Sequence, residues 1–206
     1  MITYGASDEL ILQKLREFKP DVVGVSSLFS SQVSQAYAVA RTVKKYNKET
    51  IVVFGGIHAS DKPEEVLNEE KCVDFVMRGE GDYTWSIFLE SLFIKKELKD
   101  VPGLVQRENK EFKKNPMAPL IHDMDALAIP AWDLVPMEKY FEIAMYHNPY
   151  VKSGRVGCIM TSRGCPDKCY FCSSTVFFGH KFRQMSPERV GEMVDYLVDE
   201  FKIKEL

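Results

Sequence analysis

The sequence of 206 residues contains no long apolar run and no apolar leader at its start. Its longest apolar stretches, such as residues 22–25 and 156–160, are far shorter than the roughly 20 residues that span a bilayer. The N-terminus also lacks the basic region and apolar stretch of a signal peptide. We therefore expect no association with a membrane, and we expect a cytoplasmic location.

The chain also has little net charge. Lys and Arg number 27 against 30 Asp and Glu, which gives a formal net charge of -3. There is thus no surplus of positive charge to indicate nucleic acid as a partner. Hydrophobic residues make up 45% and charged residues 28%, which is ordinary for a globular protein and too apolar for a disordered one.

Cysteine is scarce, odd in number and unevenly placed. The five cysteines are Cys72, Cys158, Cys165, Cys169 and Cys172. An odd number in a chain expected in the cytoplasm argues against a disulfide framework. Because the last three lie close together in the sequence, they indicate a metal or cluster site.

The first hundred residues alternate between helical and strand patterns. Helical periodicity covers residues 8–18, 32–46, 63–67 and 84–94, and short apolar runs cover residues 21–28, 51–54 and 73–77. Buried strands separated by helices predict a parallel sheet covered on both faces. Ligands of such sheets bind at the carboxyl ends of the strands. Here those ends are the loops at residues 26–28, 55–58 and 79–82.

The rest of the chain divides into a connecting region and a second strand–helix pattern. Six of the ten prolines lie within residues 101–150, around a predicted hairpin at residues 103–112. Residues 156–161 are a predicted strand, and the cysteine loop follows. Ser186 and Pro187 then mark the start of a helix that ends near Phe201, and residues 203–206 begin another predicted strand.

The cysteine loop has the spacing C-x3-C-x2-C. Three thiolates on one loop can hold three corners of an iron–sulfur cluster and leave the fourth metal open. Zinc is the alternative, although a structural zinc normally has four protein ligands. Cys158 is available as a fourth ligand, but it falls within the predicted apolar strand, and we interpret it as a buried core thiol.

The motif and its position resemble the radical S-adenosylmethionine (radical SAM) superfamily, because Phe171 precedes the last cysteine and the loop joins a predicted strand to a predicted helix. The resemblance implies that Cys165, Cys169 and Cys172 bind a 4Fe-4S cluster, whose fourth iron is chelated by SAM. It places Phe171 near the adenine. One-electron reduction then cleaves SAM to methionine and a 5′-deoxyadenosyl radical.

The three strand-end loops resemble those of the cobalamin-binding domains that often precede a radical SAM barrel. They carry an S-x-L element, a GG pair and a turn similar to G-E-G-E that ends in Asp. The residues that the resemblance assigns to cobalamin are Ser26, Leu28, Gly55, Gly56, Gly79 and Glu80. The D-x-H-x-x-G motif of some cobalamin proteins is absent, and we interpret His58 as a loop residue and not as a cobalt ligand.

The resemblance therefore predicts an α/β chain in three parts. Residues 1–100 form an incomplete Rossmann-like (flavodoxin-like) cobalamin-binding domain, residues 101–150 a Pro-rich linker, and residues 151–206 the first strand and helix of a (β/α) radical SAM barrel. A complete barrel needs about 250 residues, and the first strand and helix of the cobalamin domain are not found. We expect a fragment of a longer protein.

The expected function is that of an enzyme. Methyl transfer to a carbon centre is the leading chemistry, and oxidative cyclisation like that of anaerobic magnesium-protoporphyrin IX monomethyl ester cyclase is the alternative. A non-enzymatic flavodoxin-like binding module with a structural zinc loop is an alternative of another class. We expect a small-molecule or natural-product substrate and an electron donor such as flavodoxin or ferredoxin. No catalytic residue is assigned, and the fragment alone is expected to be inactive.

Overall fold

The computed structural model describes residues 6–94, 97–109, 111–143 and 150–206. The chain divides into two compact units. Unit 1 comprises Met1–Leu120 and Asp167–Gly179, and unit 2 comprises Ile121–Pro166 and His180–Leu206. Part of the cysteine loop therefore belongs to unit 1, although it follows unit 2 segments in the sequence. Residues 144–149 of the expected linker lie outside the described residues.

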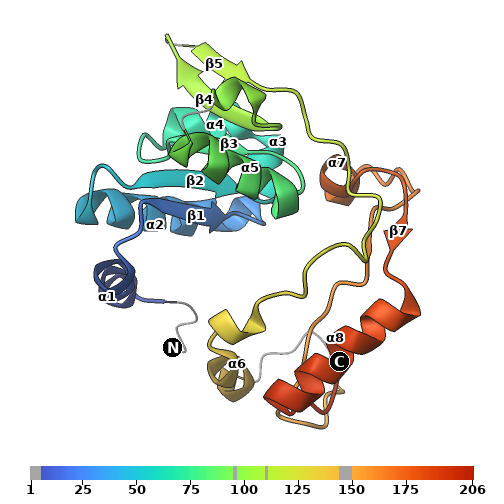
Figure 1. Ribbon diagram of the computed structural model, residues 1–206. Coiled ribbons are helices and arrows are strands. Elements are labelled where there is room, and N and C mark those ends of the chain that lie inside the picture. The colour runs from blue at the N-terminus through green and yellow to red at the C-terminus, as the bar shows by residue number, and fades with distance from the viewer. Residues whose placement is uncertain (1–5, 95–96, 110, 144–149) are drawn as a thin grey trace. The chain divides into compact units, whose positions relative to one another are not determined.

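Unit 1 is built on a five-stranded sheet in the order β1-β2-β3-β4-β5 (Figure 1). The strands are β1 (Val22–Ser26), β2 (Ile51–Gly55), β3 (Phe75–Met77), β4 (Leu104–Glu108) and β5 (Glu111–Lys114). The first three are parallel, whereas β4 and β5 add an antiparallel hairpin. Because Ser26 pairs with Gly55, the ends of β1 and β2 reach the same edge of the sheet.

Helices cover both faces of this sheet. They are α1 (Asp8–Phe18), α2 (Val33–Tyr46), α3 (Ile57–Asp61), α4 (Pro63–Glu69) and α5 (Gly81–Phe93), with short 3-10 turns η1 (Ser30–Gln32) and η2 (Leu98–Asp100). Side chains of α1 to α4 pack with Val52, Phe54 and Val76 on one face. Phe88 of α5 packs with Val53 and Met77 on the other. The alternation along β2 thus supplies two separate cores.

Unit 2 contains less regular structure. Its elements are η3 (Trp132–Leu134), α6 (Met137–Ile143), β6 (Ser162–Arg163), β7 (Arg183–Gln184) and α8 (Pro187–Phe201). As predicted, Ser186 caps α8: its side chain accepts a hydrogen bond from the N–H of Arg189, and Pro187 stands in the first turn. Leu197 of α8 packs with Phe141 and Ile203.

The predicted strand over residues 156–161 is reduced to a single parallel bridge between Val156 and Glu205. The N–H of Gly157 donates to the carbonyl of Glu205 at 2.8 Å, and the N–H of Lys204 donates to the carbonyl of Arg155 at 2.9 Å. The two predicted strands therefore meet in parallel, with α8 as the crossover between them. Among the described residues, the two segments pair only at this bridge.

The interpretation of Cys158 as a buried core thiol is wrong, because its side chain is exposed. Its neighbour Gly157 is the inward residue: a Cβ there would lie 2.8 Å from Cδ1 of Ile203 and 3.4 Å from Cδ1 of Leu197. Successive residues of an extended segment point to opposite sides. With Gly157 turned toward α8, Cys158 is turned away from this core.

The predicted α/β fold is confirmed, and most boundaries differ from the prediction by only a few residues. The hairpin predicted at residues 103–112 forms as β4 and β5, apart from residue 110, which lies outside the described residues. It joins the sheet of unit 1, so regular structure continues into the segment assigned to the linker. Among the described residues, no helix combines the length and the apolar character needed to cross a membrane.

Candidate functional site

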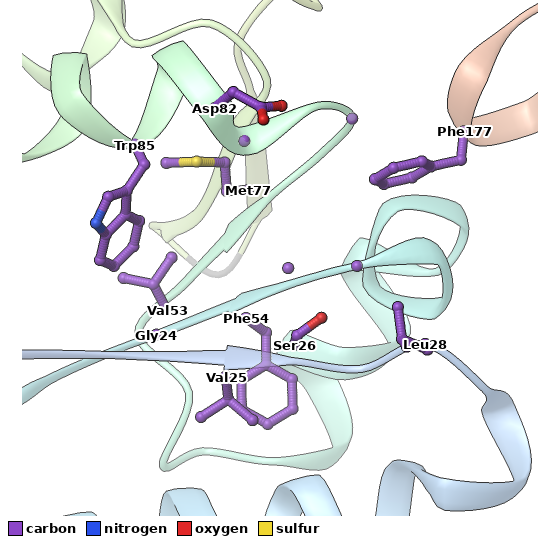
Figure 2. Close-up of a pocket in the computed structure, with 14 residues that line it drawn as sticks. Gly24, Val25, Ser26, Leu28, Val53, Phe54, Met77, Asp82, Trp85 and Phe177 are labelled. Atoms are coloured by element: carbon purple, nitrogen blue, oxygen red, sulfur yellow. The ribbon is translucent and has the colours of Figure 1, made fainter. Parts of the chain in front are cut away.

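A cavity opens at the carboxyl ends of the three parallel strands of unit 1. Its volume is about 500 Å³, which is in the range of pockets that hold small molecules and cofactors. Apolar side chains and glycines make up most of its wall (Figure 2). The lining residues are Gly24, Val25, Ser26, Leu28, Val53, Phe54, Gly55, Gly56, Met77, Gly79, Gly81, Asp82, Trp85 and Phe177.

Five of the six residues predicted to contact cobalamin line this cavity. They are Ser26, Leu28, Gly55, Gly56 and Gly79. Glu80 is the exception: it is the N-cap residue of α5, it is buried, and it is not part of the cavity wall. The fold therefore brings the S-x-L element, the GG pair and the third glycine turn to one place. That these residues bind cobalamin stays a prediction.

Gly56 is required by the backbone of the protein itself. Its φ of 90° is a conformation that favours glycine. A Cβ at Gly56 would lie 2.6 Å from the carbonyl oxygen of Ser27. The same carbonyl accepts a hydrogen bond from the N–H of His58 at 3.1 Å, and the N–H of Ser27 donates to the carbonyl of Gly55 at 2.8 Å. The loops after β1 and β2 are thus locked together at the mouth of the cavity.

The third loop is fixed from two sides. The N–H of Gly79 donates to Oγ of Ser60 on α3 at 2.9 Å. The side chain of Arg78 donates to the carbonyls of Asn115 at 2.6 Å and Gly103 at 3.3 Å. Burial lowers the pKa of Arg78 below the usual value of an arginine. The loop is therefore positioned by bonds directed away from the cavity, which leaves Gly79 free to form part of its wall.

His58 is buried and does not line the cavity. Its side chain is buried, and Nδ1 lies 2.8 Å from Oγ of Ser30. Nε2 is shielded from solvent and has no hydrogen-bond partner among the described residues. His58 is not part of the cavity wall. The interpretation of His58 as a loop residue is wrong in one respect, because His58 lies in the first turn of α3, where its contact with Ser30 joins η1 to that helix.

Sequence reasoning missed the inner wall of the cavity. Trp85 of α5 and Met77 of β3 fall within the predicted helix at residues 84–94 and the predicted strand at residues 73–77, and neither was predicted as a site residue. Both do belong to core clusters, but the same side chains also face the cavity (Figure 2). Asp82, in the first turn of α5, is the one charged side chain among the described lining residues. The sequence did contain a signal for Asp82 and Trp85, because the helix that carries them begins at the third glycine turn.

The cysteine loop supplies three thiols, of which Cys165 belongs to unit 2 and Cys169 and Cys172 belong to unit 1. Cys169 is exposed, whereas Cys165 and Cys172 are half-buried, and none of them forms a disulfide. The N–H of Cys172 donates to the carbonyl of Cys169 at 3.1 Å, which makes a tight turn. Within the described residues, no three His, Cys, Asp or Glu side chains converge to hold a metal ion. The fit to a cluster rests on donor chemistry, since thiolates are the usual ligands of iron–sulfur clusters.

The aromatic residues of the cysteine loop have different environments. Phe171, predicted to lie near an adenine, is exposed, as is Tyr170. The loop continues into the short helix α7 (Ser174–Phe178), which contacts α3 within unit 1. Phe177 of α7 extends over the cavity and forms part of its wall (Figure 2). A residue only five positions after Cys172 thus lines the candidate cobalamin site.

Comparison with known proteins shows which families this chain is similar to. Residues 1–89 match the family model of the B12 binding domain. An uncharacterised methyltransferase of Pyrococcus horikoshii is 39% identical over 95% of this chain, and the cytidylyl-2-hydroxyethylphosphonate methyltransferase of Streptomyces wedmorensis is 34% identical over 99%. The anaerobic magnesium-protoporphyrin IX monomethyl ester cyclase of Rubrivivax gelatinosus is 27% identical over 98%. The chain spans 40%, 42% and 35% of these three relatives.

Two solved structures share the fold. The cobalamin-dependent S-adenosylmethionine radical enzyme OxsB, with aqua-cobalamin and S-adenosylmethionine bound, has a TM-score of 0.76 at 21% identity; the match covers 97% of this chain and 26% of OxsB. The radical S-adenosylmethionine methyltransferase TsrM from Kitasatospora setae, with tryptophan substrate and aza-SAM bound, has a TM-score of 0.73 at 15% identity; the match covers 96% of this chain and 38% of TsrM. The fold similarity thus extends beyond the B12-binding domain.

Proposed function

We propose that this chain, which carries a B12-binding domain and is homologous to cobalamin-dependent radical SAM methyltransferases, is part of an enzyme that transfers a methyl group to a carbon centre. The observation that carries the proposal is the cavity of unit 1. Three strand ends that carry glycine or serine form its wall, and a resemblance to cobalamin-binding domains assigns them to cobalamin. The cofactors we propose are cobalamin, a 4Fe-4S cluster and S-adenosylmethionine.

The residues of the cavity fit a cofactor that is partly apolar. Gly55 has no side chain, and an added Cβ there would meet only the carbonyl oxygen of Met77 at 3.7 Å, so the backbone of β2 lies open to a bound group. Val53, Met77 and Trp85 exclude water from the inner wall. We propose that Ser26 and the loop backbones hold the nucleotide tail of cobalamin, and that the inner apolar wall receives its least polar part.

We propose Cys165, Cys169 and Cys172 as the ligands of the cluster, which would supply one electron to bound SAM. Three ligands leave one iron for SAM, and Phe171 is proposed to lie beside the adenine. An electron donor of the flavodoxin or ferredoxin type would reduce the cluster. The thiols need a reducing compartment, which supports a cytoplasmic location.

Methyl transfer is favoured over cyclisation by sequence similarity. The two methyltransferases are 39% and 34% identical to this chain, against 27% for the cyclase. Cyclisation remains the second candidate, since the cyclase aligns over 98% of the chain. The substrate we propose is a small molecule, because the relatives are named for small-molecule substrates. Nucleic acid and membranes are not among the proposed partners.

The proposal is tested by cofactor content. After anaerobic reconstitution, the chain should hold about four irons with sulfide and bind one cobalamin. Replacing Cys165, Cys169 or Cys172 by Ala should abolish the iron and leave cobalamin binding intact. Cys158→Ala is the matched control and should keep both. His58→Ala should bind cobalamin with an unchanged cobalt spectrum.

Three results would contradict the proposal. Stoichiometric zinc in place of iron would favour the non-enzymatic binding module. Loss of iron in Cys158→Ala would make that exposed thiol a ligand. Failure of the reconstituted chain to bind any corrinoid would remove cobalamin from the proposed cofactors.

A further inference from the structure

Trp85 forms the inner end of the cavity. Its ring lies against β1 at Gly24, where a Cβ would be 3.2 Å from Cη2 of the indole. Figure 2 shows Trp85 beside Gly24 and Val53, at the opposite end of the cavity from Leu28 and Phe177. The depth available to a bound group is therefore set by an aromatic side chain of α5 and not by the strands.

The indole is held in place by the core behind it. Its ring lies 5.8 Å from the ring of Phe88, centroid to centroid, at an interplanar angle of 33°. It also packs in the cluster that contains Phe75 and Ile51. Because neighbours in a packed core resist displacement, a group that reaches the end of the cavity meets a flat apolar wall that cannot easily move.

We propose that Trp85 is a specificity-determining residue, which limits the depth of the cavity and thereby selects cobamides by the size of their aromatic base. This inference rests on the proposed binding of cobalamin. The base at the end of the nucleotide tail is the flat, weakly polar part of a cobamide. Phosphate would need hydrogen-bond donors and the corrin a wider opening, whereas the inner wall consists of Val53, Met77 and Trp85.

Gly24 makes this arrangement possible. Because an added Cβ would lie 3.2 Å from the indole, a side chain at residue 24 would crowd the ring and take up space at the inner end of the cavity. Discrimination by size is strong in a filled apolar pocket, where one extra methylene changes binding by roughly tenfold or more. A base enlarged by a fused ring should therefore be rejected because Trp85 occupies the space it needs.

The test compares three corrinoids on the reconstituted chain: cobalamin, a cobamide with a naphthimidazole base, and cobinamide, which has no nucleotide. The wild type should bind cobalamin about tenfold more tightly than the naphthimidazole cobamide. In Trp85→Leu this preference should fall to about twofold or less, because the smaller side chain opens the inner end. The affinity for cobinamide should be the same in both proteins.

Two further variants make the test decisive. Trp132→Leu changes the other tryptophan, which is not part of the cavity wall, and should keep the wild-type preference. Gly24→Ala should strengthen the preference for cobalamin, and it decides the question if Trp85→Leu does not fold. An unchanged preference in a folded Trp85→Leu or Gly24→Ala protein overturns this inference alone. If the wild type binds no corrinoid, the inference and the proposed binding of cobalamin both fail.

Discussion

Gly55 and Gly56 are adjacent in the cavity wall, yet glycine has a different role at each position. At Gly55 the nearest atom to an added Cβ is the carbonyl oxygen of Met77 at 3.7 Å, an ordinary contact. At Gly56 the Cβ would lie 2.6 Å from the carbonyl oxygen of Ser27, and φ is 90°. The protein's own backbone thus requires Gly56, whereas the fold tolerates a side chain at Gly55.

This difference predicts separate effects on stability and binding. Gly56→Ala should lower the free energy of unfolding by about 1–3 kcal/mol, because a non-glycine residue is strained at this φ and meets Ser27. Gly55→Ala should leave it nearly unchanged. Gly55→Leu should keep the fold and abolish cobalamin binding, because its side chain would extend into the cavity. Thermal unfolding and absorbance titration measure the two effects.

Gly81 provides the control for the substitutions at Gly55 and Gly56. Gly81 lines the same cavity, and an added Cβ there meets no atom within 4 Å. Gly81→Ala should therefore fold like the wild type. Normal stability of Gly56→Ala would show that the loops after β1 and β2 are not locked as described. Unimpaired cobalamin binding by Gly55→Leu would remove the cavity as the cobalamin site.

Among the elements, α2 and α4 are joined by a buried carboxylate. Glu70, which follows α4, accepts a hydrogen bond from the N–H of Cys72 at 3.0 Å and pairs with Nε of Arg41 on α2 at 2.7 Å. Burial raises the pKa of Glu70, but the bonds from Cys72 and Arg41 outweigh it, and the net pKa lies below the usual value. The ionised form is thus preferred in the folded state.

Because the pKa of Glu70 is lower in the folded state, its carboxylate stabilises the folded protein at pH values above the ordinary pKa of glutamate. This stabilisation is lost as the pH falls through the lowered pKa. Glu70→Gln should reduce the free energy of unfolding by about 1–2 kcal/mol at neutral pH. The difference from the wild type should shrink as the pH falls below the ordinary pKa of glutamate and through the lowered pKa of Glu70. Urea unfolding at several pH values measures it. Glu65→Gln, on the exposed side of α4, is the control, and a difference independent of pH would contradict the assignment.

Periodicity predicted most elements of unit 1 but missed the short helices α3 and α7, which fall in segments that were predicted to be loops. Alternating and helical patterns place α1, α2 and the parallel strands within a few residues of where the structure has them. They do not give the direction in which an isolated extended segment faces. Cys158 is exposed because Gly157 faces the core, and a single glycine carries no apolar signal that could have indicated this.

The candidate site was predictable only in part, for a related reason. Strand-end glycines and Ser26 are visible in sequence because turns and loops have recognisable chemistry. Trp85 and Met77 look like core residues because they are core residues, and only the structure shows that they also face the cavity. Phe177 is separated from the cavity's other residues by more than ninety positions, and no local pattern links them.

For the molecule as a whole, the part of the cysteine loop that belongs to unit 1 is connected to the candidate cobalamin cavity. Helix α7 follows Cys172 in the sequence, contacts α3, and adds Phe177 to the cavity wall. The loop after α7 begins at Gly179, whose φ of 74° favours glycine and whose N–H donates to the carbonyl of Thr175 at 3.0 Å. We therefore expect that binding of a ligand in the cavity stabilises the segment that carries Cys169 and Cys172.

Phe177→Ala should weaken cobalamin binding by about tenfold, because an aromatic side chain is removed from the wall, without loss of reconstituted iron. In the wild type, cobalamin should slow amide hydrogen exchange in α7 and at the ends of β1, β2 and β3, since ligand binding stabilises the state that binds it. Exchange in α8, which contributes no lining residue, is the reference. Two results together would show that α7 leaves the cavity when cobalamin binds. Exchange would slow at the strand ends but not in α7, and Phe177→Ala would keep the wild-type affinity.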